Sequence, residues 1–399
     1  MERTIWIVSA KRTPLGSFQG QLKSLSAPQL GQHAINGVLD KISLSPEVIE
    51  EVFMGCVLPA GCGQAPARQA AISAGLPYST GCTTINKVCG SGMKSVMLAH
   101  DLIKAGSIQA AIAGGMESMT NAPYLLKEAR NGMRLGHRTT YDHMFLDGLQ
   151  DAYDGELMGV YAQQIADKFG FTRLQMDEWA TMSVQRALDA QKHNLFADEI
   201  VPIPVSTKHH DVIIDRDEHP GEISIEKIPT LKSAFTKHGT VTAANSSSIS
   251  DGAAALVLMD ADLAKQQGLA PLAIIKGHAS YAREPSEFTL APAFAIRQLL
   301  SSLDWSIDEV DLWEINEAFA VVTQIAVQQL GLSASKVNIK GGACALGHPI
   351  GASGARILVS LIHALKQLQA LSTVSKPLRG VASLCIGGGE ATAIGIEIP

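Results

Sequence analysis

The sequence predicts an α/β fold built from two similar halves. Short apolar segments typical of buried strands alternate with helical segments, which favours a largely parallel sheet. The strands are expected at 4–10, 110–115 and 255–259, and helices at 29–39 and 91–104. A small-residue turn, an amphipathic helix and a strand ending in glycines occur at 90–118 and again near 351–392. This repeat indicates a duplicated unit with a site at the junction of its copies.

The C-terminal third continues the same alternation. It reads "VDLWEIN", a helix through "AFAVVTQIAVQQLG", then "VNIKGG", a helix from Ser353 and "GVASLCIGGG". We therefore expect one half at 1–121 together with 250–270, and the other at 271–399.

Residues 122–249 differ from both halves and are predicted to form an inserted lobe over the core. A capping box at Thr172–Gln175 starts a helix whose apolar face holds Met176, Trp179, Ala180 and Ala187. The lobe carries His137, His143, His193, His209, His210, His219 and His238. Because none forms a His-x-x-x-His pair, solvated loop histidines are favoured over metal ligands.

Composition limits the class of protein. The chain has 399 residues, 46% of them hydrophobic and 18% charged, with a net charge of −6. These values are typical of a compact enzyme and argue against a nucleic-acid partner. We see no secretory signal and no apolar run of transmembrane length, so the expected location is cytoplasmic, without membrane attachment. The six cysteines form no Cys-x-x-Cys pair, which predicts free thiols, no disulfide and no metal site.

The stretch "NKVCGSGMKS" places Cys89 just before Gly-Ser-Gly and a helical segment. Ser91 is expected to cap that helix, and the helix dipole is expected to lower the pKa of the Cys89 thiol. The alternative is a small cysteine buried in a glycine-rich corner.

Three further stretches hold polar or reactive side chains at the ends of predicted strands or in glycine-rich turns. They are Asn316 in "NEAFA", His348 in "GGACALGHPIGASGAR" and Cys385 in "CIGGGEAT". Each could be structural by itself. Together with Cys89 they supply a nucleophile, a base, a second acid/base and amides for an oxyanion hole.

These stretches, with "VSAKRTPLGSFQG" and "AGGMESMTNAPY", resemble the thiolase family over nearly the whole chain. The match is to its acetyl-CoA acetyltransferases. The resemblance implies a five-layer αβαβα duplicated fold with an inserted loop domain, and a homotetramer. It also implies reversible condensation of two acetyl-CoA to acetoacetyl-CoA and coenzyme A, or thiolysis of 3-ketoacyl-CoA, through an acyl-Cys89 intermediate. Coenzyme A is then a substrate or product, and no metal or bound cofactor is required.

The same resemblance implies the role of each catalytic residue. Cys89 becomes acylated, and His348 takes its proton and later helps to hold the thioester oxygen. Cys385 exchanges a proton with the α-carbon of acetyl-CoA. Asn316 positions a water for one oxyanion hole, and the amides of Cys89 and Gly387 form the other.

The substrate contacts map less completely. Ser247 matches the serine near the pantetheine arm, and Ala234, Phe235, Ala243, Ala318 and Phe319 match wall positions. Leu157-Met158-Gly159 falls where many acetoacetyl-specific members have His-Met-Gly, and because Leu157 replaces the histidine we expect longer acyl chains to be tolerated. Ala244 and Ser250 also depart from the usual pattern.

Three alternatives remain from the sequence. A β-ketoacyl synthase shares the fold but uses a histidine where Cys385 stands. A degradative thiolase acts on longer 3-ketoacyl-CoA, and a silent acyl-CoA- or lipid-binding protein could use the same fold.

Overall fold

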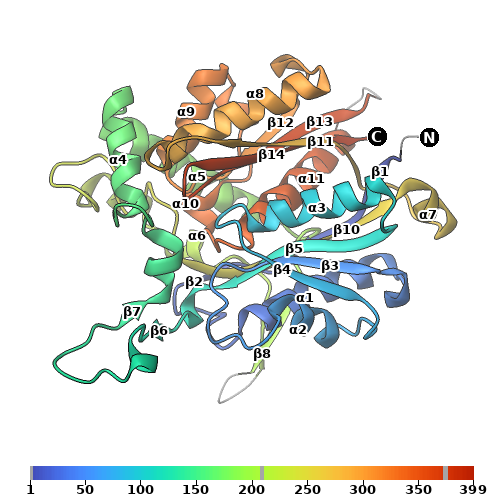
Figure 1. The fold of residues 1–399 in the computed structure, drawn as a ribbon. Helices are drawn as coiled ribbons and strands as arrows, with labels where there is room; N and C mark the ends of the chain where they lie inside the picture. The colour runs from blue at the N-terminus through green and yellow to red at the C-terminus, as the bar shows by residue number, and fades with distance from the viewer. Residues whose placement is uncertain (1–2, 207–210, 372–375) are drawn as a thin grey trace.

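Two central helices, α3 (Ser91–Ala105) and α11 (Ser353–Leu371), lie between two groups of strands (Figure 1). Helices α1 (Ala27–Ile42) and α2 (Pro66–Ser73) cover the outer face of one group, and α8 (Ala291–Leu303) and α9 (Ala320–Leu330) lie on the outer side of the other. The predicted αβαβα layering is confirmed. This computed structural model describes residues 3–206, 211–371 and 376–399.

The strands of the two halves follow the same order. In the first half the order is β4 (Gly81–Ile85), β3 (Glu51–Gly55), β5 (Ala110–Ser118), β10 (Ser250–Asp260) and β1 (Ile5–Arg12). In the second it is β12 (Leu312–Ile315), β13 (Leu378–Ile386), β14 (Glu390–Ile398) and β11 (Ala273–Ala282). The halves join where β1 pairs with β11 at Trp6–Ile274 and Ile7–Ala273. This shared order confirms the predicted duplication.

The counterpart of β4 in the second half is a single parallel bridge between Trp313 and Val337. The alternation predicted through "VNIKGG" therefore stops at this bridge, and residues 338–342 form a bend, a turn and irregular chain.

The expectation of a largely parallel sheet is wrong. Among the strands that the structure describes, only the pairs β3–β4, β3–β5 and β12–β13 are parallel, and the other pairs are antiparallel. The reason is local in the second half, where Gly387–Gly389 turn β13 directly back into β14. In the first half the inserted segment occupies the same connection, between β5 and β10, and β10 returns antiparallel to β5.

Local signals placed the helices well. Helix α1 begins after Ser26, which forms a capping box with Gln29. Helix α5 (Arg173–Lys192) begins at the predicted capping box of Thr172 and Gln175. Its four predicted apolar residues are all buried: Met176, Trp179, Ala180 and Ala187.

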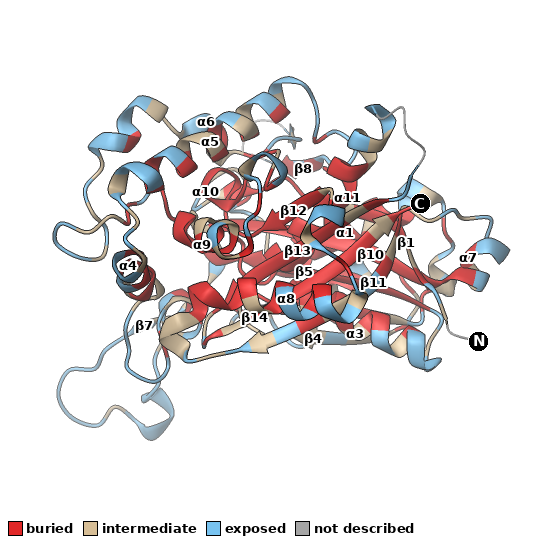
Figure 2. Ribbon diagram, turned by 90° about the horizontal axis from the view of Figure 1, so that it is seen from above, coloured by how far each residue is buried: buried red, intermediate tan, exposed pale blue. Residues whose placement is uncertain are grey.

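The remaining elements are short or belong to the inserted segment. The helices are α4 (Met158–Phe169), α6 (His219–Glu222), α7 (Ala261–Gln266) and α10 (Ala343–Leu346). The strands are β2 (Gly16–Ser17), β6 (Tyr124–Leu125), β7 (Tyr141–Asp142), β8 (Ile203–Ser206) and β9 (Asp211–Ile214). The chain joining β6 to β7 projects as an arm and is largely exposed (Figures 1 and 2).

The histidines of this segment are dispersed. His137, His193 and His238 are exposed, whereas His143 is buried between Asp147 and the amide of Ala60. His209 and His210 lie outside the described residues. Within the described ranges, no helix is both long enough and apolar enough to cross a membrane.

The two central helices touch at their N-terminal ends. A Cβ on Gly92 would lie 2.9 Å from the amide nitrogen of Ala355, and one on Gly354 would lie 2.5 Å from that of Met93. Only glycine allows this approach. It brings the loops that precede α3 and α11 together, and those loops carry Cys89 and His348.

Candidate active site

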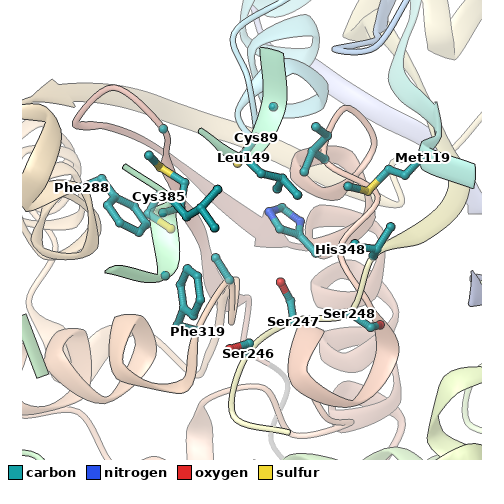
Figure 3. A pocket seen from close by; sticks show the side chains of 18 of the residues that line it. Cys89, Met119, Leu149, Ser246, Ser247, Ser248, Phe288, Phe319, His348 and Cys385 are labelled. Carbon is teal, nitrogen blue, oxygen red and sulfur yellow. The ribbon is translucent and has the colours of Figure 1, made fainter. Parts of the chain in front are cut away.

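Cys89, His348, Cys385 and Gly387 line one cavity of about 220 Å³ (Figure 3). They come from different parts of the fold. Cys89 precedes α3, His348 lies between α10 and α11, and Cys385 is near the end of β13. The structure therefore brings together, at the junction of the two halves, residues that lie up to 298 positions apart (387 − 89).

The turn before Cys89 is held by Ser91. The Ser91 hydroxyl lies 2.6 Å from the carbonyl of Val88, to which it donates, and accepts from the amide of Lys87 at 2.8 Å. The N-cap of α3 is Gly90, so the prediction that Ser91 caps this helix is wrong. Val88 has φ +46°, an unusual value for a β-branched residue. Such strained backbone is concentrated at functional sites.

The pKa of the Cys89 thiol is also not as predicted. Burial raises this pKa to about 11, although the amides of Gly387 and of Cys89 itself, which point to the sulfur, act in the opposite direction. Desolvation of the thiolate outweighs the favourable end of the helix. Cys89 therefore needs a base to become a nucleophile.

His348, which lines the same cavity, is the candidate for that base. Burial, and then the charge of Arg356, lower its pKa to about 3, so the ring is neutral. Its Nδ1 lies 2.5 Å from Ser353 Oγ, whose own proton goes to the carbonyl of Pro349. Nδ1 must then donate, which leaves the lone pair on Nε2. Among the described residues Nε2 has no hydrogen-bond partner, although it is buried.

Ser353 was not predicted as a site residue. Its position at the first turn of α11, five residues after His348, was the available signal. A hydroxyl there can reach back to an imidazole in the preceding loop.

Asn316 lies behind His348 rather than on the cavity wall. It is 1% exposed, and its Nδ2 is 3.4 Å from His348 Nδ1. Its Oδ1 accepts from the Arg356 guanidinium at 3.3 Å, which orients the amide. The residue follows β12, as the sequence predicted.

Cys385 is 1% exposed, and its pKa is raised well above the usual value, by burial and then by the nearby Cys89. Its thiolate would be a strong base in this setting. The following turn contains Gly388 and Gly389 with φ +89° and +91°, a conformation that favours glycine. This turn aims the Gly387 amide at Cys89.

Glu117, which the sequence reasoning did not single out, fixes the loops around the cavity. This buried carboxylate accepts from the amides of Val57, Leu58 and Gly351 at 3.0, 3.1 and 2.8 Å. Burial raises its pKa to about 7. Because Gly351 is three residues after His348, Glu117 ties the histidine loop to the other half of the molecule.

Six of the eight predicted substrate contacts line the cavity. They are Leu157, Met158, Phe235, Ser247, Ala318 and Phe319. Ala234 and Ala243 are exposed and do not line it. The wall has additional apolar residues that were not predicted: Met119, Phe145, Leu149, Ile249, Phe288 and Ile350.

A duplicated αβαβα core, with two thiols and a neutral histidine at its junction, defines a thiol-dependent acyl-transfer enzyme. The model of the thiolase N-terminal domain matches residues 5–262, and that of the thiolase C-terminal domain matches residues 269–398. The chain belongs to the thiolase family.

Known proteins are similar to nearly the whole chain. It is 48% identical to acetyl-CoA acetyltransferase 1 of Arabidopsis thaliana, over 99% of this chain and 94% of the relative. It is 46% identical to the acetyl-CoA acetyltransferase of Chromobacterium violaceum, over 98% and 99%. Among solved structures, the Acat5 thiolase from Ascaris suum in complex with coenzyme A is 41% identical, with a TM-score of 0.93 over 99% of this chain and 100% of that one.

Proposed function

We propose that the chain is an acetyl-CoA C-acetyltransferase, which condenses two acetyl-CoA to acetoacetyl-CoA and coenzyme A and catalyses the reverse thiolysis. The observation that carries this proposal is that Cys89, Cys385 and the neutral His348 line one apolar cavity. The names of relatives 46% and 48% identical to this chain support the same activity.

In the first half-reaction Cys89 takes the acetyl group. Nε2 of His348 accepts the Cys89 proton, and the sulfur attacks the thioester carbon of acetyl-CoA. The bond from that carbon to the sulfur of coenzyme A breaks, and the departing thiolate takes the proton from His348. Acetyl-Cys89 and free coenzyme A result, which is the first half of a ping-pong reaction.

In the second half-reaction Cys385 makes the carbon nucleophile. His348 accepts the Cys385 proton, and the thiolate removes a proton from the methyl group of a second acetyl-CoA. The carbanion attacks acetyl-Cys89, the Cys89 sulfur leaves, and it takes the proton held by His348. The raised pKa of Cys385 supports this role, because a weak carbon acid requires a strong base. We propose that the reaction requires no metal or bound cofactor.

Two oxyanion holes are proposed. The amides of Cys89 and Gly387 both point to the Cys89 sulfur, where the oxygen of the tetrahedral acyl intermediate would develop its charge. The second hole would combine Nε2 of His348 in its protonated form with a water held near Asn316. The contact of Asn316 with Arg356 supports a fixed orientation of this amide.

Labelling with acetyl-CoA tests these assignments. Cys89→Ala should abolish both acetylation and turnover. Cys385→Ser should still acquire one acetyl group, on the Cys89 peptide in mass spectrometry, but lose condensation, because a serine hydroxyl is too weak an acid/base at neutral pH. Cys82→Ser, a thiol on β4 that does not line the cavity, serves as the matched control and should keep both. An acetyl group found on Cys385 and not on Cys89 in the unaltered protein would reverse the roles.

We also propose the substrate range, which extends to longer 3-ketoacyl-CoA. Leu157 contributes an apolar side chain to a wall that already includes Leu149 and Phe288. Ser247 lines the same cavity, as expected for a contact of the pantetheine arm. We also propose that Ala234 and Ala243, which are exposed, are outer contacts of coenzyme A. The amide of Ala234 donates a hydrogen bond to the carbonyl of Val241, and the next residue, Phe235, lines the cavity.

The proposed organisation has halves at 1–121 with 250–270 and at 271–399, with a lobe at 122–249. The pairing of β10 with β5 and β1 supports this division. A homotetramer is proposed, with contacts from the exposed arm, where Leu135 is 85% and Leu126 49% exposed. Light scattering should give four chains per particle, and a monomer at micromolar concentration would contradict the assembly.

We also propose a cytoplasmic location for this reaction, which belongs to lipid metabolism. Six unpaired cysteines support a reducing compartment. A relative from Bos taurus that is 46% identical is named mitochondrial, so cell fractionation is the appropriate test. Recovery in an organelle fraction would contradict the proposal.

A further inference from the structure

Three potential metal ligands converge where helix α3 meets strand β11. His100 and Asp101 are neighbours on α3, and His278 lies on β11 of the other half. His100 Nδ1 lies 3.1 Å from Asp101 Oδ1, and His278 Nε2 lies 2.8 Å from the same oxygen. The two imidazole rings are perpendicular, with centroids 5.1 Å apart. Two rings from different halves thus approach a single carboxylate.

The distances from the two imidazole nitrogens to Asp101 Oδ1 are close to the distances between neighbouring ligands of a zinc ion. A zinc ion with ligands at about 2.0–2.1 Å in a tetrahedral arrangement separates them by about 3.3 Å. The separations of 3.1 and 2.8 Å therefore need an expansion of only a few tenths of an ångström. One ligand atom from each residue can be chosen so that all three lie within 4.8 Å of one another. The separation between the two imidazole nitrogens is therefore at most 4.8 Å, and it would shorten toward about 3.3 Å as the ion binds.

We propose that His100, Asp101 and His278 form a binding site for a transition-metal dication of the zinc type. Two imidazole nitrogens and one carboxylate oxygen suit zinc, cobalt or nickel better than calcium or magnesium, which prefer oxygen ligands. The side chain of His100 is 6% exposed, that of His278 17% and that of Asp101 52%, so an ion can enter from solvent and keep a water ligand. The positive charge of Lys104 near His100 disfavours a bound cation, whereas the negative charge of Asp101 favours one.

The site would be structural rather than catalytic. Along α3 at about 1.5 Å per residue, Asp101 lies roughly 15 Å beyond the start of the helix, where Cys89 is found. An ion there would connect α3 of the first half to β11 of the second. Because binding requires both elements in their folded positions, the ion would stabilise the folded chain by mass action. The inference is independent of the proposed catalytic roles.

The sequence could not indicate this site. The expectation of no metal was based on short spacings such as Cys-x-x-Cys and His-x-x-x-His, whereas His278 is 178 residues from His100 (278 − 100). Only the contact of two halves places it beside the other two ligands.

Titration of the metal-free full-length protein with Co²⁺ tests the proposal. We expect one ion per chain, with the weak visible bands of nitrogen and oxygen ligands and without the intense near-ultraviolet band of a thiolate. Asp101→Asn and His278→Gln should each weaken binding by at least about tenfold, since even the loss of an outer-shell partner costs 10–100-fold. His193→Gln, an exposed histidine at the end of α5, is the control and should bind as the unaltered protein does. Zn²⁺ should raise Tm in the unaltered protein and in the control but not in the two site variants.

Other outcomes would overturn the proposal. A thiolate band would place the ion at the cysteines, and equal binding in all variants would place it elsewhere. If no Co²⁺ binds at millimolar concentration, the three residues form only hydrogen bonds with one another and the metal site is refuted. Asp101→Asn changes a side chain that is half exposed, so this variant keeps the test valid if His278→Gln does not fold. Thiolysis activity should be unchanged in both variants.

Discussion

Replacement of Ser353 by alanine should slow catalysis without weakening substrate binding. Ser353 Oγ fixes the proton of His348 on Nδ1 through a contact of 2.5 Å. Without it, Nδ1 faces the Asn316 amide nitrogen at 3.4 Å, which is a donor and favours the opposite tautomer. In that tautomer Nε2 carries the proton and cannot accept one from Cys89.

The size of the effect follows from the cost of an unsatisfied buried donor. That cost is about 1–3 kcal/mol, which corresponds to a fall in kcat of about 5- to 150-fold. KM should change little, because Ser353 is fully buried and does not line the cavity. The measurement is steady-state thiolysis of acetoacetyl-CoA, followed by the loss of its enolate absorbance.

Ser360→Ala is the matched control. Ser360 is a second buried serine on α11, and it bonds to Glu199 away from the cavity. Comparable thermal stability of the two variants would show that packing is not the cause. If kcat falls no further in Ser353→Ala than in Ser360→Ala, control of the tautomer by Ser353 is refuted.

Two further predictions concern the acyl pocket and the loop anchor. Leu157→His should lower kcat/KM for a six-carbon 3-ketoacyl-CoA relative to the four-carbon substrate by at least about tenfold, because a methylene in an apolar pocket is worth about 1–3 kcal/mol. An unchanged ratio would rule out the role of Leu157. Burial raises the pKa of Glu117 from 4.5 to about 7, so the folded protein binds this proton more tightly than the unfolded chain. The stability that protonated Glu117 contributes to the folded protein is thus fully present below pH 4.5. The free energy of unfolding falls by up to about 3 kcal/mol as the pH rises through 7. In urea unfolding at pH 5 and 8, Glu117→Gln should lose this part of the pH dependence, and an equal pH dependence in both proteins would contradict it.

The sequence by itself determined the duplicated α/β organisation and the residues at the centre of the site. Apolar strands, capping boxes and glycine turns are local signals, and α1, α3 and α5 lie where those signals placed them. The residues predicted to react were singled out for a related reason. Cys89, Asn316, His348 and Cys385 each stand next to a turn or strand end that has its own pattern.

Sheet direction was decided by contacts that local patterns do not encode. Strand β10 follows the long inserted segment, and nothing in its apolar residues distinguishes a parallel from an antiparallel partner. The segment at Val337 gives a second example. Its apolar residues predicted a full strand, but in the fold it pairs with Trp313 through a single bridge.

The chemistry of the site also depended on tertiary structure. The pKa of Cys89 rises although the residue precedes a helix, since the surrounding protein removes water from the sulfur. The neutral His348 depends on burial and on Arg356, and its tautomer depends on Ser353. Desolvation, and the direction of a hydrogen bond, arise only when segments distant in sequence are packed together. The sequence therefore predicted groups that meet in one cavity, and the tertiary structure decided their protonation.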